Sequence, residues 1–404
     1  MFWTGLNQSR MVVFQAIIFR KAQSHMQSSL LQVLGQFGAI LQDHLFPAIT
    51  EELGPLSDKQ EQLIRTLALL GLEGFTGSRR GAVGRPPHDR AAIARAFVAK
   101  AVYGITQTNA MIDRLKSDVV LRRLCGWETA SQLPAECSFS RAFAEFSASE
   151  FPQRVHTALI EKTQKDRLIG HISRDSTAIE AREKPKPTPK PKAEAKPAAE
   201  KTKLPRRKRG EPKPPEQMKR IERQKTMTSE QMLADLPTCC DVGTKTNSKG
   251  RKSSWIGYKL HLDVADGQIP ITGLLTSASL HDSQAALPLA TITATRVTSL
   301  FDLMDKGYDA EDIRQHSRDL GHVPIIDRVR RPDNRDEHGE IPVKMLPHEA
   351  SRFRERTTIE RVYSRLKDEF GGNSVRVRGN AKVMAHLMFG VLALTVDQIL
   401  RLQV

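Results

Sequence analysis

The chain has 404 residues, enough for two domains with full cores, and its net charge of +16 at pH 7 favours a polyanionic partner. No apolar run is expected to supply the roughly 20 residues that span a bilayer, which argues against a membrane protein. Four cysteines without the C-x2-C spacing of a zinc site predict a reduced, cytoplasmic protein.

The N-terminal part is predicted to be helical. Residues 1–26 contain a short apolar patch but lack the leading cations and the small-residue cleavage site of an export signal, so we interpret them as an extension, with Met26 as an alternative start. From 27 to 166, apolar residues recur at spacings of three and four, which predicts an all-α N-terminal domain. Helix starts are expected at Ser57–Asp58 and at His88–Asp89.

Two segments of this helical region have features of DNA-binding proteins. Short helices on either side of a turn at Leu133 and Pro134 are compatible with a helix-turn-helix, and equally with a plain helical bundle. Between two earlier helices lies the basic Gly/Pro loop SRRGAVGRPPHDR. Its Arg79, Arg80 and Arg85 are candidate phosphate contacts.

The segment at about 183–226 is rich in Lys, Pro and Ala and almost free of large apolar residues. Between Lys184 and Lys225 it holds sixteen Lys and Arg against five Glu, which supplies +11 of the net charge. This composition cannot bury enough apolar surface to offset chain entropy, so we predict a disordered basic insertion. It either contacts DNA phosphates non-specifically or serves as a solvated linker.

Residues 167–404 show the element order of a mixed five-stranded sheet flanked by helices. Strands are predicted near 168–176, 255–265, 268–279, 298–305 and 322–327, with Asp266 and Gly267 as a hairpin turn. The apolar segment at 381–402 contains Lys382, His386 and Asp397, which is more typical of a core helix than of a membrane span.

Two aspartates follow predicted strands. Asp175 ends the first strand and Asp305 ends the fourth, and carboxylates at strand ends collect at one edge of a sheet. Taken singly, each is more simply explained as the cap of a turn or helix. His281 and Asp282 are expected to cap the helix after the third strand rather than to take part in chemistry.

A third acid lies in SRFRERTTIERVYSRLKDEFGG. The spacing of Phe353, Arg356, Glu360 and Lys367 places all four side chains on one stripe of a single predicted α-helix. A second stripe about 100° away faces a core; it consists of Ile359, Val362, Leu366 and Phe370. Two strand-end aspartates together with a helical glutamate make capping a weak explanation for the set.

Three such carboxylates suit phosphodiester cleavage. Hard divalent cations prefer oxygen ligands, and two Mg²⁺ ions about 4 Å apart can activate an attacking oxygen and neutralise a leaving one. We therefore assign Asp175, Asp305 and Glu360 as catalytic metal ligands for two Mg²⁺ ions, with Mn²⁺ as an alternative. Asp175, on the central strand, is expected to bridge the ions, and the other two acids to hold one ion apiece.

The motifs DSTAIE around Asp175, MDKGYD around Asp305 and Phe353-x2-Arg356-x3-Glu360-x6-Lys367 resemble those of bacterial insertion-sequence transposases of the DDE type. In that family the last motif reads Tyr-Arg-Glu-Lys, so Phe353 stands where Tyr is usual. A phenyl ring can stack on a base or pack beside DNA, but it cannot donate a hydrogen bond. The resemblance extends over about 230 residues and further to the segment 84–146.

The resemblance implies an RNase H-like catalytic domain at 167–404 and a DNA transposase that cleaves element ends and joins the 3′-OH strands to target DNA. It implies double-stranded DNA as partner, at terminal inverted repeats and target sites, a homodimer in the active complex, no membrane, and a bacterial cytoplasmic protein that joins the nucleoid when bound to DNA. Two alternatives stay open: an RNase H-like nuclease or resolvase without strand transfer, and a catalytically silent DNA-binding relic.

Further DNA contacts are assigned to cations near these motifs. Arg356 and Lys367 are candidate phosphate ligands on the helix of Glu360, and Phe353 is a candidate base or backbone contact. Lys306 follows the second aspartate directly. The basic run before the second strand adds three further candidates: Lys249, Arg251 and Lys252.

Overall fold

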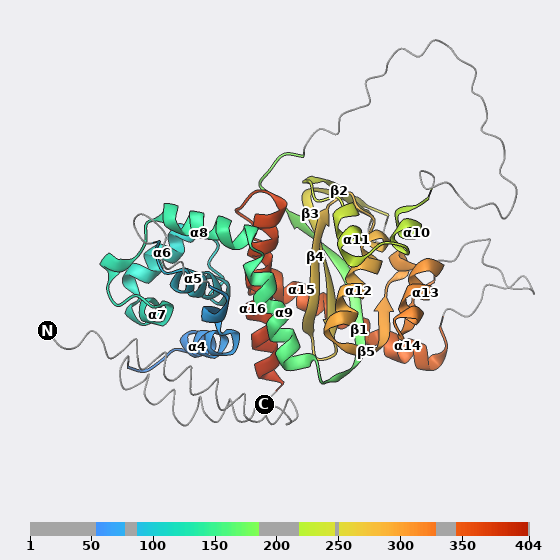
Figure 1. Ribbon diagram of the computed structural model, residues 1–404, viewed down its shortest axis with the longest axis horizontal. Helices are drawn as coiled ribbons and strands as arrows, with labels where there is room; N and C mark the ends of the chain where they lie inside the picture. The colour runs from blue at the N-terminus through green and yellow to red at the C-terminus, as the bar shows by residue number, and fades with distance from the viewer. Residues whose placement is uncertain (1–53, 77–86, 186–217, 247–249, 329–344, 403–404) are drawn as a thin grey trace, which may run out of the picture.

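The computed structural model describes residues 54–76, 87–185, 218–246, 250–328 and 345–402 (Figure 1). The predicted extension at 1–26, most of the basic insertion, and the candidate residues Arg79, Arg80, Arg85 and Lys249 lie outside these ranges.

The N-terminal region is helical, as predicted. Its helices are α4 (Asp58–Leu70), α5 (Arg90–Val102), α6 (Thr108–Ser117), α7 (Val119–Cys125), α8 (Glu136–Ala148) and α9 (Phe151–Gln164), with 3₁₀ turns η2 (Leu72–Phe75) and η3 (Ala130–Gln132). Two expected helix starts are confirmed. Ser57 accepts a hydrogen bond from the Gln60 amide as N-cap of α4, and Asp89 accepts one from the Ala91 amide as N-cap of α5.

The connection between α7 and α8 does not form the tight turn of a helix-turn-helix. It spans residues 126–135 and contains η3, so the expected turn at Leu133 and Pro134 is only the end of a longer segment. Helix α8 turns Phe139, Phe143 and Phe146 into the core. The arrangement is therefore that of a helical bundle, and the role of this region in DNA binding stays a prediction.

The sheet has six strands among the described residues: β1 (Leu168–Glu180), β2 (Asp241–Thr246), β3 (Lys252–Ala265), β4 (Ile269–Ser277), β5 (Thr298–Met304) and β6 (Val323–Ile326). Their order is β2-β3-β1-β5-β6, with β4 also paired to β3. Strand β3 is antiparallel to its neighbours β1, β2 and β4. Strands β1, β5 and β6 run parallel to one another. This mixed sheet is RNase H-like, and the five predicted strands are all present.

Strand β2 was not expected. Its sequence DVGTKT carries no apolar alternation, and it pairs only with the protruding half of β3. The predicted hairpin between β3 and β4 is confirmed. The turn includes the two predicted residues, Asp266 and Gly267, and also Gln268. The φ angles of Gly267 and Gln268, 77° and 63°, lie in the left-handed region.

Helices cover both faces of the sheet. One face carries α12 (Ala286–Arg296), and α13 (Glu311–Asp319) packs beside β6; the other face carries α15 (Thr358–Asp368) and α16 (Asn380–Arg401). The remaining short elements are α10 (Arg220–Gln224), α11 (Ser229–Asp235), η5 (Asp282–Ala285), η6 (Lys306–Tyr308), α14 (Pro347–Phe353) and η8 (Arg354–Thr357).

Part of the predicted disordered insertion is a helix. Helix α10 lies within 183–226, and Arg220 and Arg223 both form ion pairs with Asp235 of α11. Gln224, fully buried, donates to the carbonyl of Gln284. These contacts hold α10 against α11 and the turn at Gln284, which the composition of the segment does not reveal.

Helix α16 joins the two halves of the molecule (Figure 1). It packs against α4, α5, α8 and α9 on one side and against β4 and α15 on the other, and one hydrophobic core runs continuously from Leu63 through Phe389 to Leu260. Its 22 residues are long and apolar enough to cross a bilayer, but 83% of its most apolar window is buried inside the protein. This burial agrees with the predicted core helix. The division of the chain at residue 166 stays a prediction.

Candidate active site

Asp175 and Asp305 lie side by side at one edge of the parallel part of the sheet. The last pair of the β1–β5 ladder is Arg174 with Met304. Asp175 is the next residue of β1, and Asp305 directly follows the end of β5. Neighbouring strands are about 4.8 Å apart, so the two carboxylates share one site. The sequence predicted both aspartates at one edge of the sheet; the convergence of all three acids on shared metal ions stays a prediction.

The glutamate reaches the same edge from α15, but not on the single helix expected. Phe353 ends α14, Arg356 lies in the 3₁₀ turn η8, and Glu360 and Lys367 lie on α15. The Thr357 hydroxyl donates to the carbonyl of Arg354 at 3.0 Å, and such side-chain bonds to the backbone compete with regular helix. The prediction of one continuous stripe is therefore wrong, while the apolar stripe of α15 is buried as predicted.

Arg356 connects two of the three acids. Its Nη1 lies 3.3 Å from Oδ2 of Asp175, and its Nη2 lies 2.8 Å from Oε1 of Glu360. The ring centroid of Phe353 is 5.8 Å from the guanidinium carbon. A cation is thus placed between Asp175 and Glu360, where like charges would otherwise repel.

Tyr363 fixes α15 against the strand that carries Asp175. Its hydroxyl donates to the backbone oxygen of Asp175 at 2.6 Å and accepts from the amide of Leu262 at 3.1 Å. Leu262 is the partner of Asp175 in the β1–β3 ladder. Because Tyr363 lies one turn after Glu360, these bonds set the position of the glutamate relative to the aspartate.

The electrostatics of Asp175 indicate a site that favours added positive charge. Burial raises the pKa of Asp175 to about 6; the backbone amide of Ser176 and Arg356 lower it, and the charges of Asp305 and Asp282 raise it further. A carboxylate that is desolvated and flanked by like charges gains from a bound cation.

Asp282 is a fourth carboxylate near Asp175, and the sequence did not predict it. It begins η5, its side chain is 30% exposed, and it forms a 2.9 Å ion pair with Lys259 of β3. Burial opposes its ionisation, but His261 and Lys259 outweigh this and hold its pKa below the ordinary value. Since burial lowers the pKa of His261 to about 4, Lys259 is the acting cation near neutral pH. The expected cap at this turn is made by His281.

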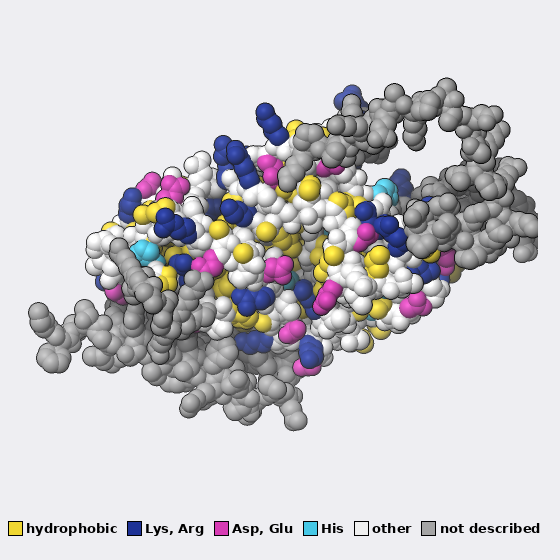
Figure 2. Space-filling view, turned by 45° about the horizontal axis from the view of Figure 1, so that its top comes forward, with side chains coloured by type: hydrophobic (Ala, Val, Ile, Leu, Met, Phe, Trp, Pro, Cys, Tyr) yellow, Lys and Arg dark blue, Asp and Glu magenta, His cyan; other side chains and the backbone are white. Residues whose placement is uncertain are grey.

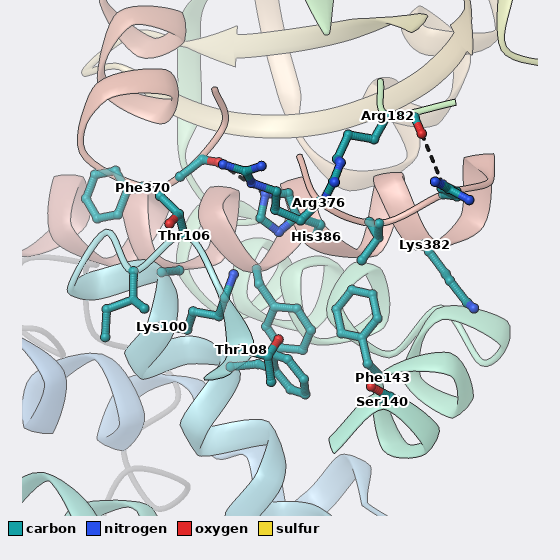
Figure 3. A pocket seen from close by; sticks show the side chains of 17 residues that line it. Lys100, Thr106, Thr108, Ser140, Phe143, Arg182, Phe370, Arg376, Lys382 and His386 are labelled. Carbon is teal, nitrogen blue, oxygen red and sulfur yellow. Dashed lines mark hydrogen bonds between the residues drawn. The ribbon is translucent and has the colours of Figure 1, made fainter. Parts of the chain in front are cut away.

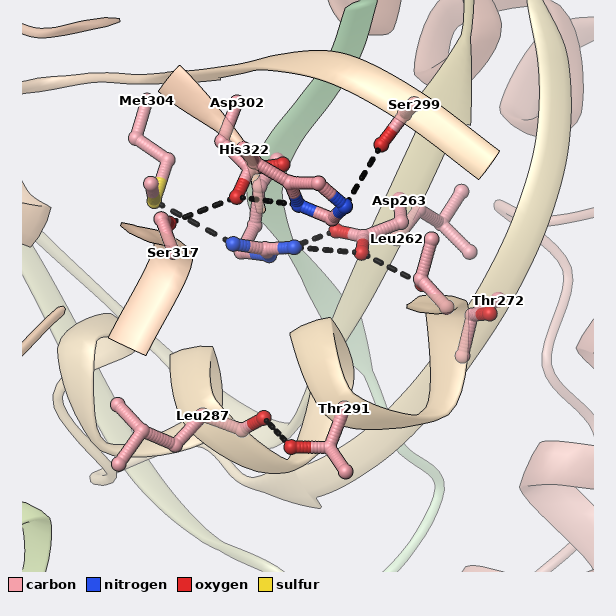
Figure 4. Close-up of polar contacts among 12 residues, drawn as sticks. Leu262, Asp263, Thr272, Leu287, Thr291, Ser299, Asp302, Met304, Ser317 and His322 are labelled. Carbon is pink, nitrogen blue, oxygen red and sulfur yellow. Dashed lines mark hydrogen bonds and ion pairs between the residues drawn. The ribbon is translucent and has the colours of Figure 1, made fainter. Parts of the chain in front are cut away.

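A buried ion pair lies on the opposite face of β1. Arg174, next to Asp175, makes two hydrogen bonds of 2.8 and 2.7 Å to Asp263 of β3, and both side chains are at most 1% exposed (Figure 4). Thr293 of α12 donates to the same carboxylate at 2.6 Å. A fully paired polar cluster of this kind fixes the register of the strands, and with it the place of Asp175.

The candidate DNA contacts are spread over the surface. Lys367 is half-buried and donates to the hydroxyl of Thr177 at 2.7 Å. Thr177 lies two residues after Asp175 on β1, so this bond keeps the Lys367 ammonium group near the acids. Lys306 is exposed beside Asp305. Arg251 and Lys252 are exposed at the start of β3, and ten strand residues, about 33 Å, separate Lys252 from Leu262. The structure does not bring these two to the acids.

The acids are suited to a divalent metal by their chemistry. Asp175, Asp282, Asp305 and Glu360 offer only oxygen donors, the type that Mg²⁺ and Mn²⁺ prefer. Within the described ranges, however, no three His, Cys, Asp or Glu side chains are close enough to hold a metal. Glu360 is turned to Arg356, so it would have to leave that pairing to complete a metal site with the aspartates.

An RNase H-like sheet with two strand-end aspartates and a helical glutamate defines the class of proteins that act on phosphodiester bonds. Comparison with family models agrees: the transposase DDE domain matches residues 170–396, and the transposase domain DUF772 matches residues 52–145. The chain therefore belongs to the transposase DDE domain family. No curated protein and no solved structure gave a significant match.

The family match establishes the class of function. The chain is a DNA transposase, the family acts on DNA, and its members typically use divalent metal ions. The second match covers most of the N-terminal helices, so both halves of the molecule belong to transposase domains.

Proposed function

We propose that Asp175, Asp305 and Glu360 are the catalytic triad of an active transposase that cleaves the ends of an insertion sequence and joins them to target DNA. The observation that carries the proposal is the placement of Asp175 and Asp305 directly beyond the last pair of the parallel β1–β5 ladder. Glu360 is tied to the same place through Arg356.

The three carboxylates would hold two Mg²⁺ ions, which supply activation of the attacking oxygen and stabilisation of the leaving oxygen. In the first reaction water attacks phosphorus at the element end, and the 3′-oxygen leaves as a free hydroxyl. In the second, that hydroxyl attacks a phosphodiester of the target, a new P–O bond forms, and the target 3′-oxygen leaves. Neither reaction needs a protein nucleophile.

Arg356 and Lys367 would bind DNA phosphates next to the acids. Arg356 can exchange its present carboxylate partners for a phosphate, which a guanidinium binds with two hydrogen bonds. Phe353 would pack beside the DNA, and Lys306 would add charge next to Asp305. The partners would be terminal inverted repeats and target DNA, and the active complex a homodimer in the bacterial cytoplasm, associated with the nucleoid.

The test uses DNA that flanks the gene, with Mg²⁺ or Mn²⁺. Asp175→Asn, Asp305→Asn and Glu360→Gln should each reduce nicking by about a hundredfold or more, because each removes a metal ligand worth several kcal/mol in the transition state. Binding of the same DNA should persist. Asp113→Asn, a change of the same type at an exposed site on α6, should leave nicking unchanged.

Substantial nicking by any of the three variants would refute the assignment. Nicking by the wild type without joined product from a 3′-OH donor strand would indicate a nuclease or resolvase. A wild type that binds DNA but shows no nicking with either metal would indicate a silent relic.

A further inference from the structure

A second site lies where the helical bundle meets the catalytic half. A cavity of about 400 Å³ opens between α5, α8, the end of α15 and the start of α16 (Figure 3). Three lining phenylalanines pack together as an apolar floor, with ring centroids 5.0–6.3 Å apart: Phe97, Phe143 and Phe389. Phe370 lines the cavity separately, and most of the other lining side chains are polar. Cavities of 300–1,000 Å³ with an apolar floor and a few convergent polar groups are typical ligand sites.

The walls of this cavity are strongly basic. Among its lining residues are five cations, and none is an Asp or Glu: Lys100, Arg182, Arg376, Arg378 and Lys382. The upper part of the surface in Figure 2 carries several Lys and Arg side chains. Arg378 donates to the carbonyl of Arg182 at 3.0 Å, which fixes one wall to the end of β1. The site is therefore built to receive an anion.

Lys100 is the strongest sign of an anionic ligand. It is only 9% exposed, and among the described residues no carboxylate pairs with its ammonium group. Figure 3 shows this group directed into the cavity, towards Arg376 and His386. Burial lowers its pKa to about 8. Among the other buried cations that the structure describes, Arg174 pairs with Asp263 and Arg314 with Asp309. Arg122 instead donates to the backbone carbonyls of Leu115 and Lys116. A buried charge without a partner is costly, and a bound anion would offset that cost.

The rest of the lining defines the ligand further. The phenylalanine floor offers apolar surface to a planar ring, and the hydroxyls of Thr106, Thr108 and Ser140 offer hydrogen bonds. A phosphate joined to a sugar and a base combines these properties in one molecule. Lys100 is only 9% exposed, so we expect a single strand to reach it more readily than an intact duplex.

We propose that this cavity binds a single nucleotide of a DNA strand, with its phosphate on Lys100 and Arg376 and its base on the phenylalanine floor. This inference rests on the proposed function for the identity of the polymer. Glu360 and the last residue of α15, Asp368, are eight residues apart, about 12 Å along the helix, and Phe370 follows two residues later. Lys367 lies between them, so one strand can extend from the acids to the cavity.

The experiment measures DNA binding in EDTA, so its outcome does not depend on metal or cleavage. The full-length protein is titrated with a single-stranded oligonucleotide, a blunt duplex, dAMP and inorganic phosphate. Lys100→Met and Arg376→Ala should each weaken binding of the oligonucleotide about tenfold and make its salt slope shallower by ~0.7. Duplex binding should change by less than twofold. Arg401→Ala removes an exposed cation at the far end of α16 and should change neither.

Arg376 is exposed, so its variant tests the site even if Lys100→Met disturbs the fold. If dAMP binds as tightly as the oligonucleotide and Lys100→Met weakens its binding, the ligand of the cavity is a free nucleotide. If only the oligonucleotide binds, the ligand is a DNA strand. Phosphate that competes as well as dAMP would overturn the assignment of a nucleotide. Unchanged oligonucleotide binding in both variants would overturn the site itself.

Discussion

Asp175 and Asp305 occupy equivalent positions in adjacent parallel strands, each one residue beyond the pair Arg174 and Met304. The arrangement follows from the topology, because the carboxyl ends of parallel strands meet at one edge. Asp305 is held there by the turn that follows it: its Oδ1 accepts from the amide of Gly307 at 2.8 Å.

Gly307→Ala should displace the Asp305 carboxylate while the fold stays intact. A Cβ added at residue 307 would lie 2.9 Å from Oδ1 of Asp305, closer than carbon and oxygen normally approach. We expect nicking to fall about tenfold or more and Mn²⁺ binding to weaken, with little change in melting temperature. Gly74→Ala is the matched control, because a Cβ there meets nothing within 4 Å. Normal nicking by Gly307→Ala would show that the carboxylate needs no fixed position.

Tyr363→Phe should loosen the glutamate helix. The change removes the hydroxyl between the backbone oxygen of Asp175 and the amide of Leu262, and leaves two buried groups without this partner. The free energy of unfolding should fall by about 1–3 kcal/mol. Nicking should fall more than this loss of stability explains at temperatures where the variant is folded. Urea unfolding and single-turnover nicking check the two effects; equal nicking by folded variant and wild type would contradict the positioning role.

The sequence was sufficient to place the two strand-end aspartates and to predict the five main strands, because both depend on local signals; the role of the three acids as metal ligands stays a prediction. Strand ends followed by Asp, and a glutamate with a buried stripe beside it, can be read from periodicity. The same local reading placed Phe353 on the helix of Glu360, because helical spacing does not show that Thr357 competes for the Arg354 carbonyl. Strand β2, with its polar sequence, is determined by its pairing with β3.

Features formed by tertiary contacts could not be predicted in this way. Asp282 looks like a helix cap in sequence, and only the hairpin of β3 and β4 brings it towards Asp175. The basic cavity combines Lys100 and Arg376, which are far apart in the chain. A signal was nevertheless present: Lys100 stands among the apolar residues of RAAIARAFVAKAV, where a buried cation calls for a partner.

Asp282→Asn should weaken metal binding, because it removes a negative charge that acts on Asp175. We expect the affinity for Mn²⁺ to fall roughly tenfold, in line with the loss of one nearby charge. Lys259→Met tests the alternative that Asp282 only partners Lys259, with which it forms an ion pair of 2.9 Å. If Asp282 had only that role, both variants would alter Mn²⁺ affinity equally. We expect Lys259→Met to preserve or increase it.

Lys100→Met should stabilise the fold at neutral pH, at the expense of the proposed nucleotide site. Burial holds the pKa of Lys100 at about 8 in the folded protein, against an ordinary value of 10.5. Below pH 8 the lysine is charged in both states, so the folded protein carries the whole desolvation cost, about 3 kcal/mol. Between pH 8 and 10.5 the unfolded state binds more protons, and the stability of the wild type rises relative to the variant.

Urea unfolding at pH 7 and pH 10 measures this difference directly. The variant should be more stable by up to about 3 kcal/mol at pH 7, and the gap should shrink by more than half at pH 10. The neighbouring His386 does not change the direction of this pH dependence. Burial, and then the charge of Lys100, lower the pKa of His386 to about 4, so it is neutral at both pH values. Lys382→Met, at an exposed position of the same cavity, is the control and should show no pH-dependent difference in stability from the wild type. If Lys100→Met differed from the wild type by the same free energy at both pH values, the burial of an unpaired ammonium would be contradicted.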